Sequence, residues 1–568
     1  MYRDELKELI SFVDKSNELF NFDEEAISQN SIWDIYSYLF KCHLDNKLVT
    51  LSSLADYCRL PRATAIRKIN SLINKSIILQ RPRTKTGKTY SLHPSEKLLQ
   101  SFENYLKEIK YHVAFSLGYE NKNNNNFYFG TSFFSANIIP PPGILNINCN
   151  PNEKIKMLLG DDPTFIVINK NKKFIENMLG VKLEISLMNN NSLREELIKN
   201  SKLRVSKYDI ISYDMPWTGE IHKNKYLLPL NEIIHTNNFN IKDFHPAGIK
   251  ASTYNNNLYG LPIEEVASIM VYRKDIFDSL GLKIPKNITE LFFCLKKLEK
   301  FSPTKYSFAW PGVSGFPFGC HFMEMMGNLG SPLIKLREIS KGIFDTSNLD
   351  TTPNVIDLTS DASINSIYLL SKIKQYSHPN ILSMTWDDVA KSYTKGDVAV
   401  ANIWSGRCGF FENNKESPAY KNSFYTAKPG GKEGFEASSI GGFSLGIPIN
   451  INSNKVKIIF SIIKYLVSPP MIKYYIENGV TASPLFSVSN DPEVQKSNPS
   501  LISIDNMQKK GLIKNWLRVP IPNYFNIANL IGNVLHTNLK NRSNTINKAE
   551  SLKIAQSIQS SLKDLLSI

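Results

Sequence analysis

The sequence lacks the features of several large classes of protein. Six cysteines are scattered over 568 residues with no Cys-X-X-Cys pair, which argues against a disulfide framework. No run of 18 apolar residues occurs, so no transmembrane helix is expected. The first ten residues contain acids where a signal peptide needs a basic and then an apolar region. These absences predict a cytoplasmic protein with reduced thiols and no membrane partner.

Motifs of catalysis and metal binding are absent as well. The nine histidines show no zinc-binding spacing, and there is no Walker A loop, nucleophile elbow or dinucleotide fingerprint. Asp161-Asp162 and Asp387-Asp388 could pair for acid–base catalysis, although such acids are more typical of solvated turns. Cys149 ends a predicted strand, although a buried structural cysteine is the commoner case. We expect no enzymatic activity, no metal and no cofactor.

One segment lacks acids altogether. Between Tyr57 and Ser95 there are nine Lys and Arg residues and no Asp or Glu, as expected for a surface that faces phosphates. Residues 51–58 favour a short helix, and Pro61 can start a second helix whose apolar positions recur at helical spacing. Strands at 77–81 and 88–92 then flank a basic turn, which completes a winged-helix pattern. The residues expected to contact double-stranded DNA are Arg62, Thr64, Arg67, Lys68, Arg81, Arg83, Lys85 and Lys88.

This segment resembles a MarR-type winged helix over roughly residues 30–115. The resemblance is carried by Leu60-Pro-Arg-Ala-Thr-Ala-Ile-Arg-Lys-Ile-Asn-Ser-Leu72, Ile77-Ile78, the basic wing and Tyr90-Ser-Leu-His-Pro-Ser-Glu96. An ordinary charged helical hairpin is the alternative. A long helix with one apolar side is predicted from Pro94 to Val113. In MarR-like proteins the terminal helices form the dimer interface, so the resemblance implies a homodimer; packing onto its own domain is the other possibility.

The remainder of the chain has a different pattern of residues. Residues 118–143 have a linker composition, rich in Asn at 121–126 and in Pro at 140–143, so we expect domains at 1–117 and 144–568. After Gly143, predicted strands at 144–149, 181–187 and 208–212 alternate with helices. This alternation predicts an open, mostly parallel α/β sheet, which binds ligands beyond the carboxyl ends of its strands.

Separated motifs in the second domain resemble family 1, maltose-binding type extracellular solute-binding proteins. They are Tyr208-Asp-Ile-Ile-Ser-Tyr-Asp-Met-Pro-Trp217, Leu227-Leu-Pro-Leu-Asn231, Tyr259-Gly-Leu-Pro-Ile-Glu-Glu265, Lys395-Gly-Asp-Val-Ala-Val-Ala-Asn-Ile-Trp-Ser-Gly406 and Ser439-Ile-Gly-Gly-Phe-Ser-Leu-Gly446. The resemblance covers roughly residues 150–568. It implies a two-lobed α/β, periplasmic-binding-protein-like (type 2) domain that closes on a ligand. Family members are exported, whereas no signal peptide is expected here, which favours a ligand sensor over transport.

The resemblance also implies where the ligand binds. An acid that contacts ligand follows Gly-Leu-Pro in the family, but two acids stand there in this sequence. A family ligand aromatic matches the tryptophan that follows the strand at 398–403. Indole faces pack on sugar rings and carboxylates accept from hydroxyls, so Trp386 is a further cleft candidate. Core packing is an equally good reading for most of the tryptophans. The predicted ligand-binding residues are Asp214, Trp217, Glu264, Glu265, Trp310, Trp404 and Arg407.

Together these patterns predict a cytoplasmic transcriptional regulator. It would join a dimeric DNA reader to a module that senses a small molecule of the carbohydrate class. A solute-binding component of an ABC transporter and an enzyme on the two-lobed scaffold are the alternatives.

Overall fold

In the computed structural model the chain divides into two compact units, residues 1–130 and 131–568, and the division falls inside the predicted linker. The structure describes residues 29–44, 47–83, 89–102, 105, 119–121, 126–128, 154–179, 181–346, 349, 355–431, 435–540, 542 and 544–566. The strand expected at 144–149, Cys149, Lys85 and Lys88 lie outside these residues.

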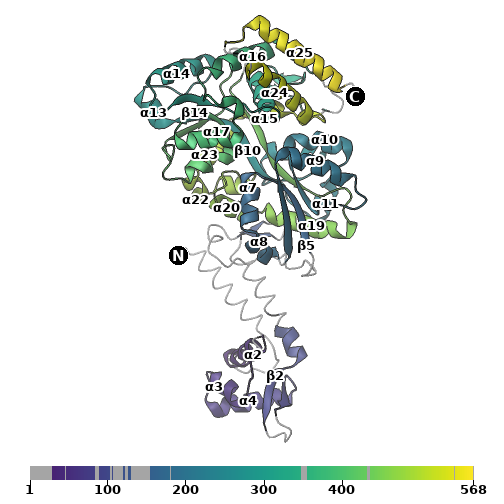
Figure 1. Ribbon diagram of the computed structural model, residues 1–568. Helices are drawn as coiled ribbons and strands as arrows, with labels where there is room; N and C mark the ends of the chain where they lie inside the picture. The colour runs from purple at the N-terminus through teal and green to yellow at the C-terminus, as the bar shows by residue number, and fades with distance from the viewer. Residues whose placement is uncertain are drawn as a thin grey trace. The chain divides into compact units, whose positions relative to one another are not determined.

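The first unit is a small helical domain with a β-hairpin (Figure 1). Its elements are α2 (Gln29–Leu44), α3 (Leu51–Tyr57), α4 (Arg62–Asn74), β1 (Ile78–Pro82) and β2 (Tyr90–Pro94), and a second hairpin comprises β3 (Tyr119–Asn121) and β4 (Asn126–Tyr128). Thr50 and Ser53 form a capping box that starts α3. The elements between 51 and 94 therefore form close to where the sequence places them.

Apolar side chains from every element between α2 and the end of the first hairpin meet in one core. Ile35, Leu54, Ile69 and Leu92 are among its most deeply buried members. Phe102, in the helical segment 96–102, also belongs to this core, where its ring stacks on Trp33 with centroids 5.5 Å apart. The described start of the predicted dimer helix thus packs onto its own unit.

The second unit is an α/β structure. Its strands are β5 (Lys154–Gly160), β6 (Lys182–Met188), β7 (Ile210–Asp214), β8 (Thr253–Tyr254), β9 (Asn257–Leu258), β10 (Leu261–Arg273), β11 (Tyr306–Ala309), β12 (Glu338–Ser340), β13 (Ile343–Phe344), β14 (Val398–Trp404), β15 (Ser423–Thr426), β16 (Ser438–Gly446) and β17 (Ile513–Lys514).

Helices pack around these strands (Figure 1). The α-helices are α7 (Pro163–Lys170), α8 (Lys172–Leu179), α9 (Asn190–Ser201), α10 (Thr218–Asn224), α11 (Asn231–Thr236), α12 (Pro246–Ala251), α13 (Lys274–Ser279), α14 (Ile288–Phe301), α15 (Phe316–Asn328), α16 (Asp361–Lys374), α17 (Trp386–Lys395), α18 (Gly409–Glu412), α19 (Val456–Leu466), α20 (Pro469–Glu477), α21 (Phe486–Ser489), α22 (Pro492–Ser497), α23 (Pro499–Lys509), α24 (Tyr524–Lys540) and α25 (Lys548–Leu566). The 3-10 helices are η2 (Met215–Trp217), η3 (Ile381–Ser383), η4 (Ser405–Arg407), η5 (Ser453–Lys455) and η6 (Asn515–Arg518).

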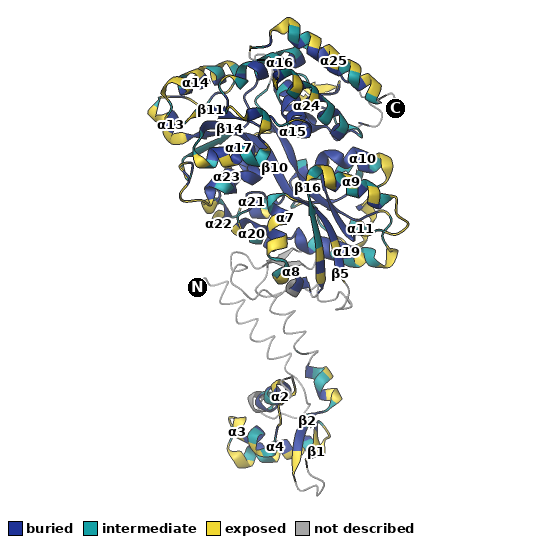
Figure 2. Ribbon diagram, in the orientation of Figure 1, coloured by how far each residue is buried: buried dark blue, intermediate teal, exposed yellow. Residues whose placement is uncertain are grey.

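Two strands cross between the halves of the sheet, whose order is β11-β14-β10-β16-β7-β5-β6. The first half of β10 pairs with β16, and its second half pairs with β14 and β15. We call the half with β5, β6 and β7 the first lobe and the half with β11 and β14 the second lobe. Both β10 and β16 are buried along their whole length (Figure 2), because helices cover both faces.

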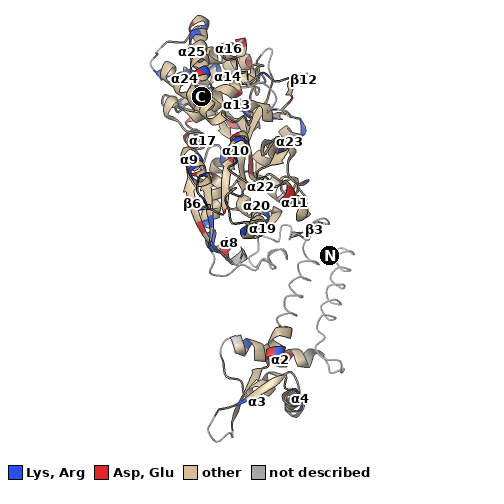
Figure 3. Cartoon of the chain, turned by 90° about the vertical axis from the view of Figure 1, so that its right-hand side faces the viewer, with Lys and Arg blue, Asp and Glu red and all other residues tan. Residues whose placement is uncertain are grey.

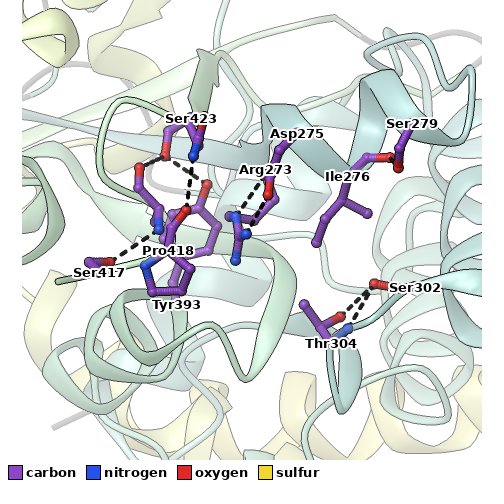
Figure 4. A network of polar contacts seen from close by, with 12 residues as sticks. Arg273, Asp275, Ile276, Ser279, Ser302, Thr304, Tyr393, Ser417, Pro418 and Ser423 are labelled. Atoms are coloured by element: carbon purple, nitrogen blue, oxygen red, sulfur yellow. Dashed lines mark hydrogen bonds and ion pairs between the residues drawn. The ribbon is translucent and has the colours of Figure 1, made fainter. Parts of the chain in front are cut away.

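Polar contacts anchor the far end of β10 in the second lobe (Figure 4). The guanidinium of Arg273, the last residue of β10, donates to both oxygens of Asp275 at 2.9 and 2.6 Å. Nearby, the hydroxyls of Tyr393 on α17 and Ser423 on β15 lie 3.0 Å apart. The crossing strand is thus tied at this end to the elements around it.

The sheet differs from the sequence-based expectation in two respects. Strands β5, β6 and β7 are parallel neighbours, as are β11 and β14, but both crossing strands pair antiparallel with their main-sheet neighbours. The expectation of a mostly parallel sheet is therefore wrong at its centre. In addition, the strand β5 was not anticipated, and two short helices, α7 and α8, follow it before β6.

Candidate functional site

A cavity lies where the crossing strands meet the ends of β5, β7 and β14. Its volume is about 310 Å³ when the solvent at its open side is included. It receives residues from both lobes and from the crossing strands. The lining residues are Asp162, Asn190, Asp214, Glu264, Val266, Trp386, Trp404, Arg407, Gly442, Phe443 and Arg518.

Glu264 is the most unusual of these side chains. It is 1% exposed, and neither carboxyl oxygen has a hydrogen-bond partner in the described part of the chain. Burial, and secondarily the nearby carboxylate of Asp162, raise the pKa of Glu264 well above its usual value. A buried group of this kind is costly unless a partner arrives from outside.

The neighbouring acid, Glu265, faces the opposite side of β10. Its Oε1 accepts a hydrogen bond from Nε2 of Gln508 at 2.6 Å and lies 3.2 Å from Nδ1 of His245. Glu265 does not line the cavity. The structure therefore separates two adjacent acids into one that faces the cavity and one that is bonded within the protein.

Arg407 joins the two lobes across the cavity. From η4 of the second lobe its guanidinium donates to both oxygens of Asp162, which follows β5 of the first lobe, at 3.2 and 3.4 Å. Its Nε also donates to Asp387 at 2.6 Å. Burial acts to lower the pKa of Arg407, but the charges of Asp162 and then Asp387 outweigh it, so this pKa is raised overall. The guanidinium remains charged and is already paired on two sides.

Arg518 forms a second buried ion pair at the cavity. Its Nη2 donates to Oδ2 of Asp214 at 2.9 Å, and its Cζ lies 5.0 Å from the ring centroid of Trp404. Burial raises the pKa of Asp214, and the charge of Arg518 opposes that rise. Trp404 is thereby fixed with a guanidinium over its ring and still lines the cavity.

Two of the predicted ligand residues lie elsewhere. Trp217 is 1% exposed and packs edge-to-face on Phe525 of α24, at 6.0 Å between ring centroids. Trp310 is fully buried, stacks on His321 of α15 and donates from Nε1 to Ser377 at 2.9 Å. Both indoles serve the packing of helices against the sheet rather than the cavity.

The structure brings together Asp214, Glu264, Trp404 and Arg407 from the predicted set. It adds residues that sequence reasoning did not select: Asp162, Asn190, Phe443 and Arg518. Asp162 belonged to an acid pair that was noted, and its position after a strand was the available signal. Arg518 lies about 70 residues beyond the end of the motif Ser439–Gly446 and belongs to none of the quoted motifs, so no local pattern indicated it.

The predicted DNA-contacting residues lie on the first unit. Arg62, Thr64, Arg67 and Lys68 are all on α4, where the two arginines are exposed. Arg81 and Arg83 are exposed at the end of β1 and just after it. Figure 3 colours the Lys and Arg residues of the described chain blue and its Asp and Glu residues red. Arg62 is also 3.5 Å from Asp56, in a solvent-exposed pair.

Within the described ranges, no three His, Cys, Asp or Glu side chains are grouped so that they could hold a metal ion. Among those same ranges, no helix is long and apolar enough to cross a membrane.

The crossing strands, two lobes and cavity define a two-lobed binding protein. The family model for bacterial extracellular solute-binding proteins matches residues 179–472, which is more than half of the chain. The chain belongs to this family. The expected cytoplasmic location is wrong by this finding, because the family is one of extracellular proteins. The resemblance to family 1 extracellular solute-binding proteins is confirmed for residues 179–472.

Solved structures agree with this assignment. An ABC transporter solute-binding protein of Agrobacterium radiobacter in complex with ribitol is 20% identical, with 73% of this chain and 99% of that chain covered and a TM-score of 0.65. A maltose-bound protein of T. maritima is 19% identical, with 72% of this chain and 99% of that chain covered and a TM-score of 0.61. An Agrobacterium vitis protein with bound D-mannitol is 17% identical, with 72% of this chain and 99% of that chain covered and a TM-score of 0.61. At these identities the likeness establishes the periplasmic-binding-protein-like fold. Two of these relatives are solute-binding proteins of ABC transporters; the expectation of no catalysis stays a prediction.

Proposed function

We propose that the second unit binds a small polyhydroxylated solute, a sugar or sugar alcohol, as the solute-binding component of an ABC transporter. The observation that carries this proposal is the Glu264 carboxyl, which is buried at the cavity with no hydrogen-bond partner in the described part of the chain. The relatives above hold ribitol, maltose and D-mannitol, which supports the same chemical class.

The cavity offers both kinds of contact that such a solute needs. Trp386 and Trp404 present indole surface against which the C–H faces of a sugar pack. Carboxylate oxygens of Glu264 and the amide of Asn190 accept or donate hydrogen bonds to hydroxyl groups. Because Arg407 of one lobe bonds Asp162 of the other, lobe closure assembles the whole set around the solute.

Calorimetric titration of the full chain with ribitol, D-mannitol, maltose and related solutes tests this function. Trp404→Ala should weaken binding at least about tenfold, because an aromatic anchor in a buried site typically contributes about 2 kcal/mol or more. Trp310→Phe is the matched control, since that indole is buried but does not line the cavity. Uptake of the solute by cells with and without the chain then tests delivery to a permease.

The proposal fails if no solute of this class binds. It also fails if Trp404→Ala, shown by thermal unfolding to be folded, binds as well as the parent protein.

A second candidate function belongs to the first unit, which we propose reads double-stranded DNA as a winged helix and makes the chain a solute-controlled regulator. The supporting observation is the order of α3, α4, β1 and β2 together with the exposed Arg62 and Arg67 on α4 and the absence of acids from the sequence 57–95. In such folds the second helix enters the major groove and the wing meets phosphates. Two copies would bind two half-sites, so this candidate includes a homodimer.

Binding of the full chain to duplex DNA at several salt concentrations tests this candidate. The double substitution Arg62→Glu, Arg67→Glu should abolish binding, since phosphate neutralisation dominates affinity and two signs are reversed. The control is Lys296→Glu, Lys300→Glu, which reverses two exposed charges on α14 of the second unit. An equal loss of DNA binding in both double variants would indicate non-specific attraction and would reject the candidate. Light scattering on the full chain gives the oligomeric state.

A further inference from the structure

The charges around the solute cavity are unequal in number. Five ionisable side chains line it: the acids Asp162, Asp214 and Glu264, and the arginines Arg407 and Arg518. A sixth group, Asp387, stands behind Arg407 and is bonded to it. The acids therefore outnumber the guanidinium groups by two.

Both guanidinium groups are already engaged. Arg407 has donated two hydrogen bonds to Asp162 and one to Asp387, and Arg518 is paired with Asp214. Each guanidinium is thus hydrogen-bonded to another carboxylate and forms no ion pair with Glu264 in the described ranges, although the charge of Arg407 still acts to lower the pKa of Glu264. Glu264 is the acid left over, since no ion pair links it to a cation within the described ranges.

The surroundings of Glu264 make this imbalance significant. Its carboxyl is 1% exposed and lines the cavity, so bulk water does not solvate it freely. A buried carboxyl either keeps its proton or, when it is ionised, needs a partner that brings hydrogen-bond donors and positive charge. The partner of the Glu264 carboxyl can therefore come from the solute in the cavity.

We infer that the solute carries a protonated amine that pairs with Glu264, which makes it an amino sugar or an amino polyol. This inference rests on the proposed binding of a polyhydroxylated solute and narrows its chemical class. An ammonium group supplies three donors to a carboxylate that has none, and an indole face such as that of Trp404 also attracts a cation. A neutral hydroxyl can satisfy the hydrogen bonds of Glu264 but cannot balance its charge.

Proton linkage follows from the same arrangement. Burial and then Asp162 raise the pKa of Glu264, while Arg407 acts to lower it; Asp214 and Arg518 complete the charged groups at the cavity. An ammonium ion binds the ionised carboxylate, so it should displace the proton from a neutral Glu264. Affinity for the amine should therefore rise with pH through the raised pKa, as long as the amine itself stays protonated.

Matched pairs of solutes test the inference on the full chain. The pairs are D-glucose with D-glucosamine, D-galactose with D-galactosamine, and D-glucitol with 1-amino-1-deoxy-D-glucitol, titrated by calorimetry in two buffers of different ionisation enthalpy. The amine of at least one pair should bind about 10- to 100-fold more tightly than its neutral partner, the usual range for a charged hydrogen bond. Proton release should accompany that binding.

Two isosteric variants locate the effect. Glu264→Gln should reduce the amine preference to near one, whereas Glu265→Gln should retain it, because Glu265 is bonded to Gln508 on the other side of β10. Thermal unfolding of each variant shows that it is folded. Neutral solutes that bind as tightly as their amines, or a preference that survives Glu264→Gln, would overturn the inference. In the first of these outcomes the proposed solute-binding function would stand. If no member of any pair bound, the inference would be rejected, and the solute-binding function would be rejected with it only if ribitol, D-mannitol and maltose also failed to bind.

Discussion

Replacing Glu264 by glutamine should stabilise the solute-free protein at neutral pH. The wild-type carboxylate is 1% exposed and has no hydrogen-bond partner among the described residues. Its lost hydration therefore lowers the free energy of unfolding. Glutamine keeps the shape and removes the charge. Unsatisfied buried polar groups cost about 1–3 kcal/mol, and charged ones more, so we expect the free energy of unfolding to rise by about 1–3 kcal/mol.

The direction of the pH dependence is fixed by the raised pKa of Glu264. Between its unfolded pKa, about 4.3, and the raised folded pKa, the folded protein binds more protons than the unfolded chain. The wild-type protein therefore loses stability from this group as the pH rises through that interval. The advantage of Glu264→Gln should be absent below both pKa values and complete above the folded pKa.

Calorimetric unfolding from acidic to neutral pH, followed on the transition of the second unit, measures both effects. The matched control is Glu265→Gln, one residue away and also buried, at 4% exposed. That substitution weakens the bonds from Gln508 and His245 and should lower stability by about 1–2 kcal/mol. Equal changes in the two variants, or a Glu264→Gln protein that is less stable than wild type at neutral pH, would refute the reasoning.

Three further predictions concern other parts of the molecule. Arg407→Met should lower the free energy of unfolding by about 3 kcal/mol in denaturant titrations, because it leaves a buried acid without its partner. Gly319→Ala should cost about 1–3 kcal/mol or more in the same assay, since an added Cβ would lie 1.9 Å from the carbonyl oxygen of Ala528 on α24. The hydrogen bond from Arg59 lowers the pKa of Asp34, so the first unit should lose stability as the pH falls through that pKa, and circular dichroism should show Asp34→Asn to be less sensitive to acid.

Local pattern was sufficient to predict much of the first unit and of the central strands. Helical spacing and Pro61 are local signals, and α3 and α4 form where they indicate. The strand expected at 398–403 appears as β14, with Trp404 at its end facing the cavity. These features depend on residues that are close in sequence.

The order of the strands decides which tryptophan lines the cavity. Trp310 follows β11 much as Trp404 ends β14, and the two strands are parallel neighbours. However, β11 is at the edge of the sheet, where Trp310 packs under α15, whereas β14 lies next to the crossing strand β10. Strand order is set by pairing across the whole chain, which the sequence pattern around either tryptophan does not contain. The same holds for Arg518, which reaches the cavity from η6.

The choice between Glu264 and Glu265 depends on a single irregularity in the sheet. Adjacent residues of a strand face opposite sides, so only one of the two acids can face the cavity. The pairing of β10 with β16 shifts between Pro262 and Glu264, an irregularity that sets which side each following residue faces. Glu265 pairs with Gly442, whose φ is +114°, and a Cβ there would lie 2.0 Å from the carbonyl oxygen of Glu264.

The Gly441-Gly442 pair therefore does two things at once. Gly442 permits the close approach of β16 to the shifted strand, which directs Glu264 into the cavity. A Cβ on Gly441 would lie 2.6 Å from the ring of Trp404 and 2.8 Å from Nη1 of Arg518. Because Gly441 has no Cβ, these two side chains can occupy that space and line the cavity. The motif Ser439-Ile-Gly-Gly-Phe-Ser-Leu-Gly446, which in the sequence was only a sign of resemblance, thus has a physical role: it shapes the strand that orients the buried carboxylate and the space beside it.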